Sequence, residues 1–323
     1  MACRSIPNAR GFRHSHRHLQ RGRPRLSPPV TAGTVVAVFG RRFEVEADDG
    51  TRLECVTRGR KHDAVCGDRV SFSMTGARSA VIEKLLPRRN YLERSDAHKR
   101  KGIAANIDQV LVLAAVEPRA SEEFLTRILL IADAAGVNTI LALNKVDLPG
   151  ADEARARLML FVGAGHELIE FSARPDHEHA PTAPAVLLSR LHGRRTVLCG
   201  QSGMGKSSLV NALVPDAPAV TGELSSALGS GRHTTTFSRL YHIDAESTLI
   251  DCPGMQEVGI HHLSHADLAK GFREFAPYLG HCRFSNCSHV HEPDCAVRAQ
   301  VTEGGIARER LALFQKLVAE TGA

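Results

Sequence analysis

One segment restricts the fold of this chain more than any other: LCGQSGMGKSSLVNAL, residues 198–213. An apolar strand-like run ends in a glycine-rich turn of the form GxxxxGKS, and a helix-like run follows. Glycines let backbone N–H groups approach a phosphate, the helix N-terminus favours anions and Lys206 adds positive charge, while the Ser207 hydroxyl suits Mg²⁺. The alternative is a chance match in a glycine-rich loop. The residues expected to line this phosphate site are Gly200, Gln201, Ser202, Gly203, Met204, Gly205, Lys206, Ser207 and Ser208.

A second phosphate-side motif, LIDCPG, places Asp251 at the end of another apolar strand. Its carboxylate is expected to orient the Mg²⁺ shell, while the Gly254 N–H faces the γ-phosphate. The segment GELSSALGSGRHTTT precedes it and ends in Thr234, Thr235 and Thr236. This composition suits a switch loop in which Thr235 or Thr236 ligates Mg²⁺. A plain flexible loop is the alternative.

The base is indicated by NKVD, which follows the strand-like run TILAL. Asp147 can accept two hydrogen bonds from guanine, with Asn144 bracing the loop and the Lys145 stem lying along the base. Ser172 and Ala173 end a further strand-like run, where a backbone N–H can reach guanine O6. Adenine would leave the carboxylate unpaired, and sites built on buried hydrogen bonds reject such mismatches strongly. The sequence therefore predicts GTP and GDP as ligands and disfavours an ATP-dependent kinase.

The order of these motifs is reversed relative to an ordinary GTPase, because the guanine-reading segments precede the phosphate-binding ones. A sheet whose termini lie close together can be reopened elsewhere without losing its site, since the strand ends still meet at one crevice. The sequence thus predicts a circularly permuted P-loop GTPase. The chain leaves this site soon after Gly254 and runs directly into a cysteine-rich segment.

The flanks of the α/β region differ from it in pattern. Short alternating strands with glycine and Asp-Gly turns predict an oligonucleotide-binding (OB) type β-barrel with basic loops; a barrel that only packs on its neighbour is the alternative. From about Lys101, strands alternate with helices, one of them capped by Ser121, which predicts a parallel sheet. The expected organisation is a basic arm (1–30), an OB-fold barrel (31–98), the permuted GTPase (99–262) and a mostly helical zinc-binding domain (263–323).

Three of the eight cysteines crowd together in CRFSNCSHVHEPDC. Three thiolates and one imidazole make the tetrahedral set that structural zinc prefers. The candidate ligands are Cys282, Cys287, His289 and Cys295, with His291 as a competitor to His289, and buried thiols without metal are the alternative. No apolar signal-peptide core precedes them, so we expect a reducing, cytoplasmic location.

Charge points to an acidic partner. The formal net charge is +6, the isoelectric point is about 9.0 and no acid occurs before Glu44. We expect the Arg- and His-rich arm to be disordered and to touch nucleic acid; the alternatives are an uninformative tail, a misassigned start of the chain or an organelle transit peptide. The best apolar run, residues 110–116, has only a strand's length. A soluble protein without a membrane segment is therefore expected.

Taken in order, NKVD, FSA, GQSGMGKSS, GRHTTT and DCPGMQEVG, flanked by a barrel and by Cys-x4-Cys-x-His-x5-Cys, resemble the circularly permuted ribosome small-subunit-dependent GTPase A family (RsgA, also called YjeQ). The resemblance covers nearly everything from about Thr31 onward. It implies a monomer that binds the 30S subunit and its 16S rRNA, hydrolyses GTP late in subunit assembly and is thereby released. It also selects the Cys3His set above as the zinc ligands.

The resemblance carries an expectation about catalysis. Met255 stands where other GTPases have a water-orienting glutamine, and Gln256 comes one residue later. Intrinsic turnover should therefore be slow and should rise on the 30S subunit, with His233 supplying the missing hydrogen bond beside Lys206 and Gly254. A solvent-facing loop histidine is the alternative for His233. The alternative function is an RNA-binding assembly scaffold that uses GTP mainly as a conformational ligand.

Overall fold

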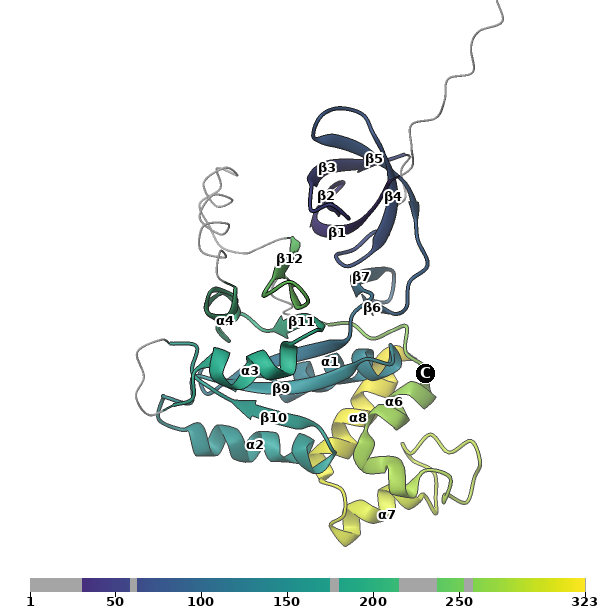
Figure 1. Cartoon of the computed structure of the whole chain (residues 1–323). Coiled ribbons are helices and arrows are strands. Elements are labelled where there is room, and N and C mark those ends of the chain that lie inside the picture. Colours follow the sequence, from purple (N-terminus) through teal and green to yellow (C-terminus); the bar gives the residue numbers. More distant parts are fainter. Residues whose placement is uncertain (1–30, 59–62, 175–179, 215–236, 253–257, 323) are drawn as a thin grey trace, which may run out of the picture.

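The computed structural model describes residues 31–58, 63–174, 180–214, 237–252 and 258–322, so the predicted basic arm lies outside it. Figure 1 shows three parts: a small barrel above, a sheet covered by helices in the middle, and a helical C-terminal module below. This is the predicted order of parts along the chain. None of the described helices is long and apolar enough to cross a bilayer.

The barrel is closed, as predicted, because its first strand pairs on both sides. β1 is antiparallel to β2 and to β4, and β3 is parallel to β5. Alternating side chains point inward and fill the interior, as expected for a small barrel. The interior includes Val35, Val45, Phe72 and Ile82, which are at most 1% exposed. The strands are β1 (Thr31–Phe39), β2 (Arg42–Ala47), β3 (Arg52–Thr57), β4 (Arg69–Met74) and β5 (Ser79–Leu85).

The central sheet has the order β10-β9-β8-β11-β13-β12. The first five strands are parallel, and β12 is antiparallel to β13. The chain order reverses between β8 and β11, and in open α/β sheets ligands bind in the crevice outside the carboxyl ends of strands at such a reversal. The strands are β8 (Gln109–Ala115), β9 (Asn138–Asn144), β10 (Glu167–Glu170), β11 (Arg195–Gly200), β12 (Ser238–His242) and β13 (Thr248–Asp251).

Within the described residues, four helices connect these strands. Helix α1 begins as predicted, with the Ser121 hydroxyl accepting a hydrogen bond from the Phe124 N–H. Residues 124–132 of α1 are all buried, because the sheet covers one side of the helix and the C-terminal helices the other. The helices are α1 (Glu122–Ala134), α2 (Ala151–Gly163), α3 (Ala183–Leu191) and α4 (Lys206–Leu213).

The barrel and the central sheet are joined edge to edge. Ala37 and Val38 of β1 pair with Arg239 and Ser238 of β12, so one continuous hydrogen-bonded sheet runs through both parts. A separate hairpin of β6 (Tyr91–Ser95) and β7 (Arg100–Ala105) follows the barrel and crosses the boundary expected at residue 98. The predicted domain boundaries stay predictions.

The C-terminal module packs on α1. Phe272, Phe275 and Phe314 have ring centroids 5.1–5.3 Å apart and belong to the same core as the buried face of α1. The Arg310 guanidinium, itself buried, donates to the Thr126 hydroxyl of α1 at 2.7 Å. The module is mostly helical, as predicted, and contains α6 (His265–Gly271), the 3-10 helix η1 (Arg273–Tyr278), α7 (Ala296–Glu303) and α8 (Arg308–Thr321).

Candidate nucleotide site and cysteine cluster

The glycine-rich turn lies at the crevice that the strand order predicts. It connects the end of β11 to the start of α4, and Gly203 and Gly205 have φ values of 81° and 94°. A Cβ on Gly205 would lie 2.3 Å from the Asn144 side-chain nitrogen. Only glycine fits there, because the left-handed backbone and the close approach of Asn144 both exclude a side chain.

Lys206 is folded back over this turn. Its Nζ donates to the carbonyl oxygens of Gly200 at 2.7 Å and Gln201 at 3.1 Å. Burial lowers the pKa of Lys206, and the nearby Asp251 carboxylate opposes that change. A partly buried ammonium group at a helix N-terminus is a strong attractant for phosphate oxygens.

Asp251 ends β13, beside Leu198 of β11. Its Oδ1 is buried and has no hydrogen-bond donor among the described residues. Burial raises the pKa of Asp251 to about 6, although Lys206 acts in the opposite direction. A buried carboxylate oxygen without a donor fits a cation, and the Ser207 hydroxyl at the start of α4 is a second oxygen of the kind that Mg²⁺ prefers.

Asn144 connects three loops. Its Nδ2 donates to the Met204 carbonyl at 2.9 Å, and its Oδ1 accepts from the N–H groups of Lys145 at 2.7 Å and Ala173 at 3.0 Å. The side chain is 1% exposed, so none of these bonds competes with bulk water. The sequence predicted a brace within one loop, and the structure shows that the same side chain also ties that loop to the glycine-rich turn.

Lys145 also connects the base loop to the glycine-rich turn. Its Nζ donates to the carbonyl oxygens of Glu117 at 2.7 Å and Gly203 at 2.8 Å, so its aliphatic stem spans the crevice. Its φ of 64° is left-handed, which an ordinary residue adopts only when its surroundings hold it there. The base loop is therefore fixed to the turn by two side chains.

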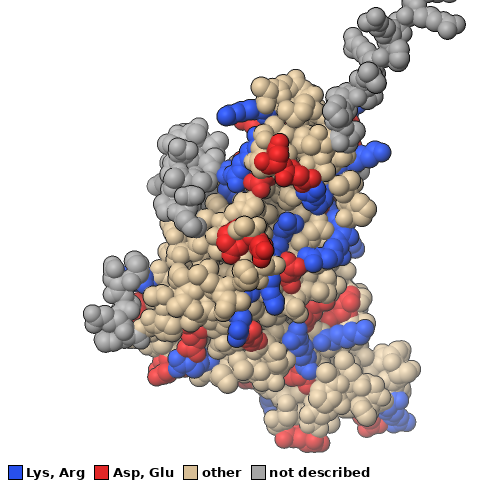
Figure 2. Space-filling model, in the orientation of Figure 1, with Lys and Arg blue, Asp and Glu red and all other residues tan. Residues whose placement is uncertain are grey.

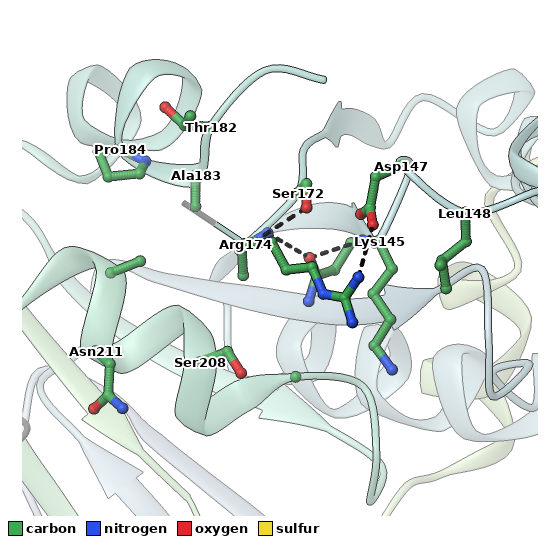
Figure 3. A pocket seen from close by; sticks show the side chains of 14 residues that line it. Lys145, Asp147, Leu148, Ser172, Arg174, Thr182, Ala183, Pro184, Ser208 and Asn211 are labelled. Carbon is green, nitrogen blue, oxygen red and sulfur yellow. Dashed lines mark hydrogen bonds and ion pairs between the residues drawn. The ribbon is translucent and has the colours of Figure 1, made fainter. Parts of the chain in front are cut away.

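A cavity of about 800 Å³ opens between these loops (Figure 3). Asp147 is 1% exposed at its side chain and faces the cavity, and Arg174 approaches to 3.8 Å between Nη1 and Oδ2. The Ser172 hydroxyl accepts from the Arg174 N–H at 3.2 Å and so shapes the third loop. The lining includes Asn144, Lys145, Asp147, Ser172, Ala173 and Ser208, all predicted from the sequence as nucleotide contacts.

Not every residue of the predicted phosphate set points into the crevice. Gln201 turns its Oε1 toward α1, where it accepts from the Ser121 N–H at 3.0 Å. Met204 is buried, so it offers only its backbone, whereas Ser202 and Ser207 are exposed. His233, Thr235, Thr236 and Gly254, like Met255, lie outside the described residues, and their expected roles stay predictions.

Sequence reasoning missed part of the lining. Arg174 lines the cavity and approaches the Asp147 carboxylate, and its position directly after FSA was the one signal in the sequence that could have found it. Glu117, two residues after the end of β8, does not line the cavity, but its carbonyl accepts from Lys145 Nζ, and nothing in its sequence context marks it. Thr182 and Ala183, at the start of α3, close the cavity on the far side and became recognisable only once the helix was placed (Figure 3).

The cysteine cluster forms a compact set. One ligand atom from each of Cys282, Cys287, His289 and Cys295 lies within 4.8 Å of all the others. His289 Nδ1 is 3.5 Å from Cys282 Sγ and 3.4 Å from Cys295 Sγ, whereas the competing His291 is exposed. Burial raises the pKa of Cys287 to about 12, so a bound cation would be needed to hold that sulfur as a thiolate. The cluster can hold a metal ion.

Comparison with known proteins decides the family. A family model described as RsgA GTPase matches residues 85–261, more than half of the chain. A protein named small ribosomal subunit biogenesis GTPase RsgA, from Burkholderia pseudomallei (strain K96243), is 48% identical over 292 residues, covering 89% of this chain and 91% of that protein. The chain belongs to the RsgA GTPase family. It is therefore a hydrolase acting on GTP, and the predicted resemblance is confirmed.

Other RsgA relatives agree. The protein of the same name from Paraburkholderia xenovorans (strain LB400) is 48% identical over 305 residues, covering 92% of this chain and 96% of its own. The crystal structure of YjeQ from Thermotoga maritima aligns with a TM-score of 0.66 and 28% identity, covering 91% of this chain and 99% of that one. The crystal structure of YloQ, described as a circularly permuted GTPase, aligns with a TM-score of 0.64 and 22% identity, covering 96% of this chain and 98% of that one. The permuted fold is confirmed.

Proposed function

We propose that this GTPase binds the small ribosomal subunit, hydrolyses GTP at a late step of subunit biogenesis and is released as a result. The observation that carries the proposal is the cavity that Asp147 and Gly205 both line, because the Asn144 bond to Met204 holds the loop of Asp147 against the glycine-rich turn that precedes Lys206. The names of the RsgA relatives supply the partner. The scaffold alternative is not favoured, since those relatives are named as GTPases.

The proposed contacts follow from the geometry of the cavity. Asp147 accepts from guanine N1–H and the exocyclic amine, and the Ala173 N–H donates to O6. The glycine-rich turn and Lys206 hold the β- and γ-phosphates. Mg²⁺, when bound, neutralises phosphate charge as GTP is cleaved. We propose that Ser207 and Asp251, together with Thr235 or Thr236, hold the Mg²⁺.

The reaction transfers the γ-phosphoryl group to water. The water oxygen forms a bond to the γ-phosphorus as the bond to the β–γ bridging oxygen breaks, and GDP leaves with the bonding electrons while the proton of water ends on solvent or phosphate. Lys206 and the Gly254 N–H stabilise charge on the transferred group. We propose that His233 orients the attacking water, because Met255 offers no hydrogen bond, so that turnover is slow until the subunit orders this arrangement.

We further propose that the metal held by the cysteine cluster is zinc, one ion per chain, because zinc best fits three thiolates and one imidazole. The partner surface on the small subunit includes 16S rRNA, in keeping with the net positive charge. The protein acts as a monomer in the cytoplasm, where ribosomal subunits are assembled.

GTP turnover with purified 30S subunits, with 50S subunits and with neither tests the proposal. We expect weak intrinsic turnover and a large increase with 30S alone. Equal stimulation by 50S, or none by 30S, would contradict it. The variant His233→Ala separates the scaffold alternative, because that alternative expects normal release from 30S even when turnover collapses.

A further inference from the structure

Ion pairs join the C-terminal module to the GTPase part along α1. Figure 2 shows Lys and Arg side chains close to Asp and Glu side chains on the lower half of the molecule, where these two parts meet. Ion pairs on an exposed surface contribute little to stability. Two arginines at this contact are different, because Arg127 of α1 and Arg310 of α8 are only 11% and 6% exposed at their side chains.

The guanidinium of Arg127 binds three groups. Its Nε and Nη2 donate to Glu123 Oε1, one turn earlier in α1, at 3.2 Å and 2.7 Å. Its Nη1 donates to one carboxylate oxygen of Glu320 in α8 at 2.7 Å, and its Nη2 donates to the other. Its Nη1 also donates to the main-chain carbonyl of Val258 at 3.1 Å. Two carboxylates therefore orient the planar group, and one of its N–H bonds is directed at a backbone oxygen.

Val258 lies close to the nucleotide site along the chain. It is the first described residue after 253–257, the segment that contains Gly254, and Asp251 ends β13 just before that segment. Val258 belongs to the hydrophobic core and is 2% exposed. A buried carbonyl needs a hydrogen-bond donor, and Arg127 supplies it from α1.

The residues that follow Val258 are held by other contacts. The Ser95 N–H, at the end of β6, donates to the Gly259 carbonyl at 2.9 Å, and the His261 N–H donates to the Ser95 carbonyl at 3.4 Å. A Cβ on Gly259 would lie 2.0 Å from the Ser95 carbonyl oxygen, so this approach requires glycine. Backbone pairing therefore fixes this stretch, whereas a side chain of α1 fixes the Val258 carbonyl.

Stability alone does not explain an arginine at position 127. Removing charges from water has a cost that often exceeds their attraction, and well-packed apolar residues can replace a buried ion pair without loss of stability. An apolar side chain would, however, leave the Val258 carbonyl without this donor. A lysine could donate to that carbonyl, but a single ammonium group cannot match two carboxylates with a planar set of donors. The guanidinium therefore suits the task of holding one backbone carbonyl in a fixed place.

We propose that Arg127 is a positioning residue for GTP hydrolysis. Its bond to Val258 fixes the downstream end of the segment that contains Gly254, while Glu123 and Glu320 fix the guanidinium itself. Arg127 acts through Val258 rather than on GTP. The inference rests on the GTP hydrolysis of the proposed function but not on its ribosomal partner. It adds a side chain of α1, and a carboxylate of the last helix, to the groups that arrange the reaction.

GTP hydrolysis under single-turnover conditions, without ribosomal subunits, tests the proposal. Arg127→Ala should lower the rate constant about 10- to 100-fold, because a small displacement near the reacting phosphate is costly even when its cause is remote. GDP affinity, measured by calorimetry, should stay within about twofold of wild type, since Asn144 and Lys145 still hold the base loop on the glycine-rich turn. An unchanged rate constant, or a loss of GDP affinity as large as the loss in rate, would refute the positioning role.

Arg310→Ala is the matched control for stability. It removes a second buried arginine from the same contact, one that donates to the Thr126 hydroxyl at 2.7 Å and to Glu274 at 2.6 Å. Both variants should melt at lower temperature than wild type, because each leaves buried carboxylates without their partner. At a temperature where thermal melting shows both to be folded, Arg310→Ala should hydrolyse GTP at the wild-type rate. Equal losses of rate in the two variants would overturn the proposal.

The conservative variant separates the bond to Val258 from the ion pairs. Arg127→Lys keeps a cationic donor for the Val258 carbonyl but loses the planar set of N–H groups. We expect it to recover part of the rate that Arg127→Ala loses, while its melting temperature stays below that of the wild type. A folded lysine variant that is as slow as the alanine variant would contradict the role of the Val258 bond.

The outcomes keep this inference apart from the ribosomal partner. If 30S subunits fail to stimulate the wild type, the proposed partner is wrong, and the single-turnover results on Arg127 are unaffected. If 30S subunits stimulate the wild type and Arg127→Ala hydrolyses GTP at the wild-type rate without them, only the positioning role is wrong.

Discussion

The side-chain amide of Asn144 donates a 2.9 Å hydrogen bond to the main-chain carbonyl of Met204. This bond joins segments 60 positions apart in the sequence and passes directly over Gly205, which has no room for a Cβ. In a permuted chain the two halves of the site lack the usual order of connection. The Asn144 side chain, together with Lys145, therefore holds the two halves of the pocket in contact.

Removing that connection should weaken both the site and the fold. Asn144→Ala deletes the bonds to Met204 and Ala173 and leaves their backbone groups without these partners, which costs about 2–3 kcal/mol. We expect GDP affinity measured by calorimetry to fall about 30- to 100-fold and the melting temperature to drop. Asn138→Ala, at the exposed start of β9, should change neither. Normal GDP binding by Asn144→Ala would contradict the role of the bond.

Asp147→Asn should change the preferred base. The amide loses one of the two acceptor sites for guanine and gains a donor suited to the C2 carbonyl of xanthine. We expect the affinity of the variant for GDP to fall about 10²- to 10³-fold, because hydrogen bonds to a buried charged group are lost. Its affinity for xanthosine diphosphate should exceed that of the wild type. Competition with a fluorescent guanine nucleotide measures both affinities, and unchanged selectivity would rule out Asp147 as the base reader.

Asp251 should make the stability of the nucleotide-free protein depend on pH. The unfolded chain ionises this carboxyl near pKa 3.8, whereas the folded chain keeps its proton up to about pH 6. Between these values the native state binds more protons, so the stability contributed by this group falls as pH rises, and the loss is complete above about pH 6. With Mg²⁺ chelated, the free energy of unfolding of Asp251→Asn relative to wild type should rise by about 2–3 kcal/mol from pH 4 to pH 7.

Urea titrations at several pH values measure that difference. Asp152→Asn is the control, because the Asp152 side chain is 92% exposed and its curve should run parallel to that of the wild type. Parallel curves for Asp251→Asn as well would show that the carboxylate is not destabilised by burial. In the presence of Mg²⁺ and GTP the same variant should lose turnover, since it removes the proposed cation ligand.

Substitutions of His289 and His291 should have different effects on zinc binding. His289 Nδ1 faces the sulfur atoms of the cluster, whereas His291 is exposed. His289→Ala should reduce bound zinc well below one ion per chain and lower the melting temperature by about 5–10 °C, in line with a loss of about 2–3 kcal/mol. His291→Ala should retain both. Zinc content is measured by atomic absorption after gel filtration, and zinc loss in His291→Ala alone would invert the assignment.

Much of the fold could be predicted from the sequence because the decisive signals are local. A strand, a glycine-rich turn and a helix follow one another around Lys206, and the alternating pattern of residues 31–85 sufficed for a barrel. The cysteine cluster was also readable as a candidate metal site, since its members lie within one short segment, but the choice of His289 over His291 came from the family resemblance.

What could not be predicted depends on contacts between distant segments. Nothing in the sequence around Ala37 indicates that it pairs with Arg239, because the residues of an edge strand do not specify which other strand will pair with it. The link between Ser95 and Gly259 is likewise made by backbone groups, which every residue has. Arg127 reads as an ordinary charged position on a helix, and only the packing of α8 against α1 shows why it is buried.

The shared ladder between barrel and GTPase sheet affects how the protein is made. The first half of β1 pairs with β4 inside the barrel, but Ala37 and Val38 must wait for Ser238 and Arg239. During translation the barrel strands are synthesised long before β12, so the edge of β1 at Ala37 and Val38 stays unpaired in the meantime. An unpaired strand edge can pair with other chains. The nascent chain therefore exposes an unpaired, aggregation-prone strand edge during much of its translation. That edge becomes covered only when β12 of the GTPase sheet has been synthesised and pairs with it.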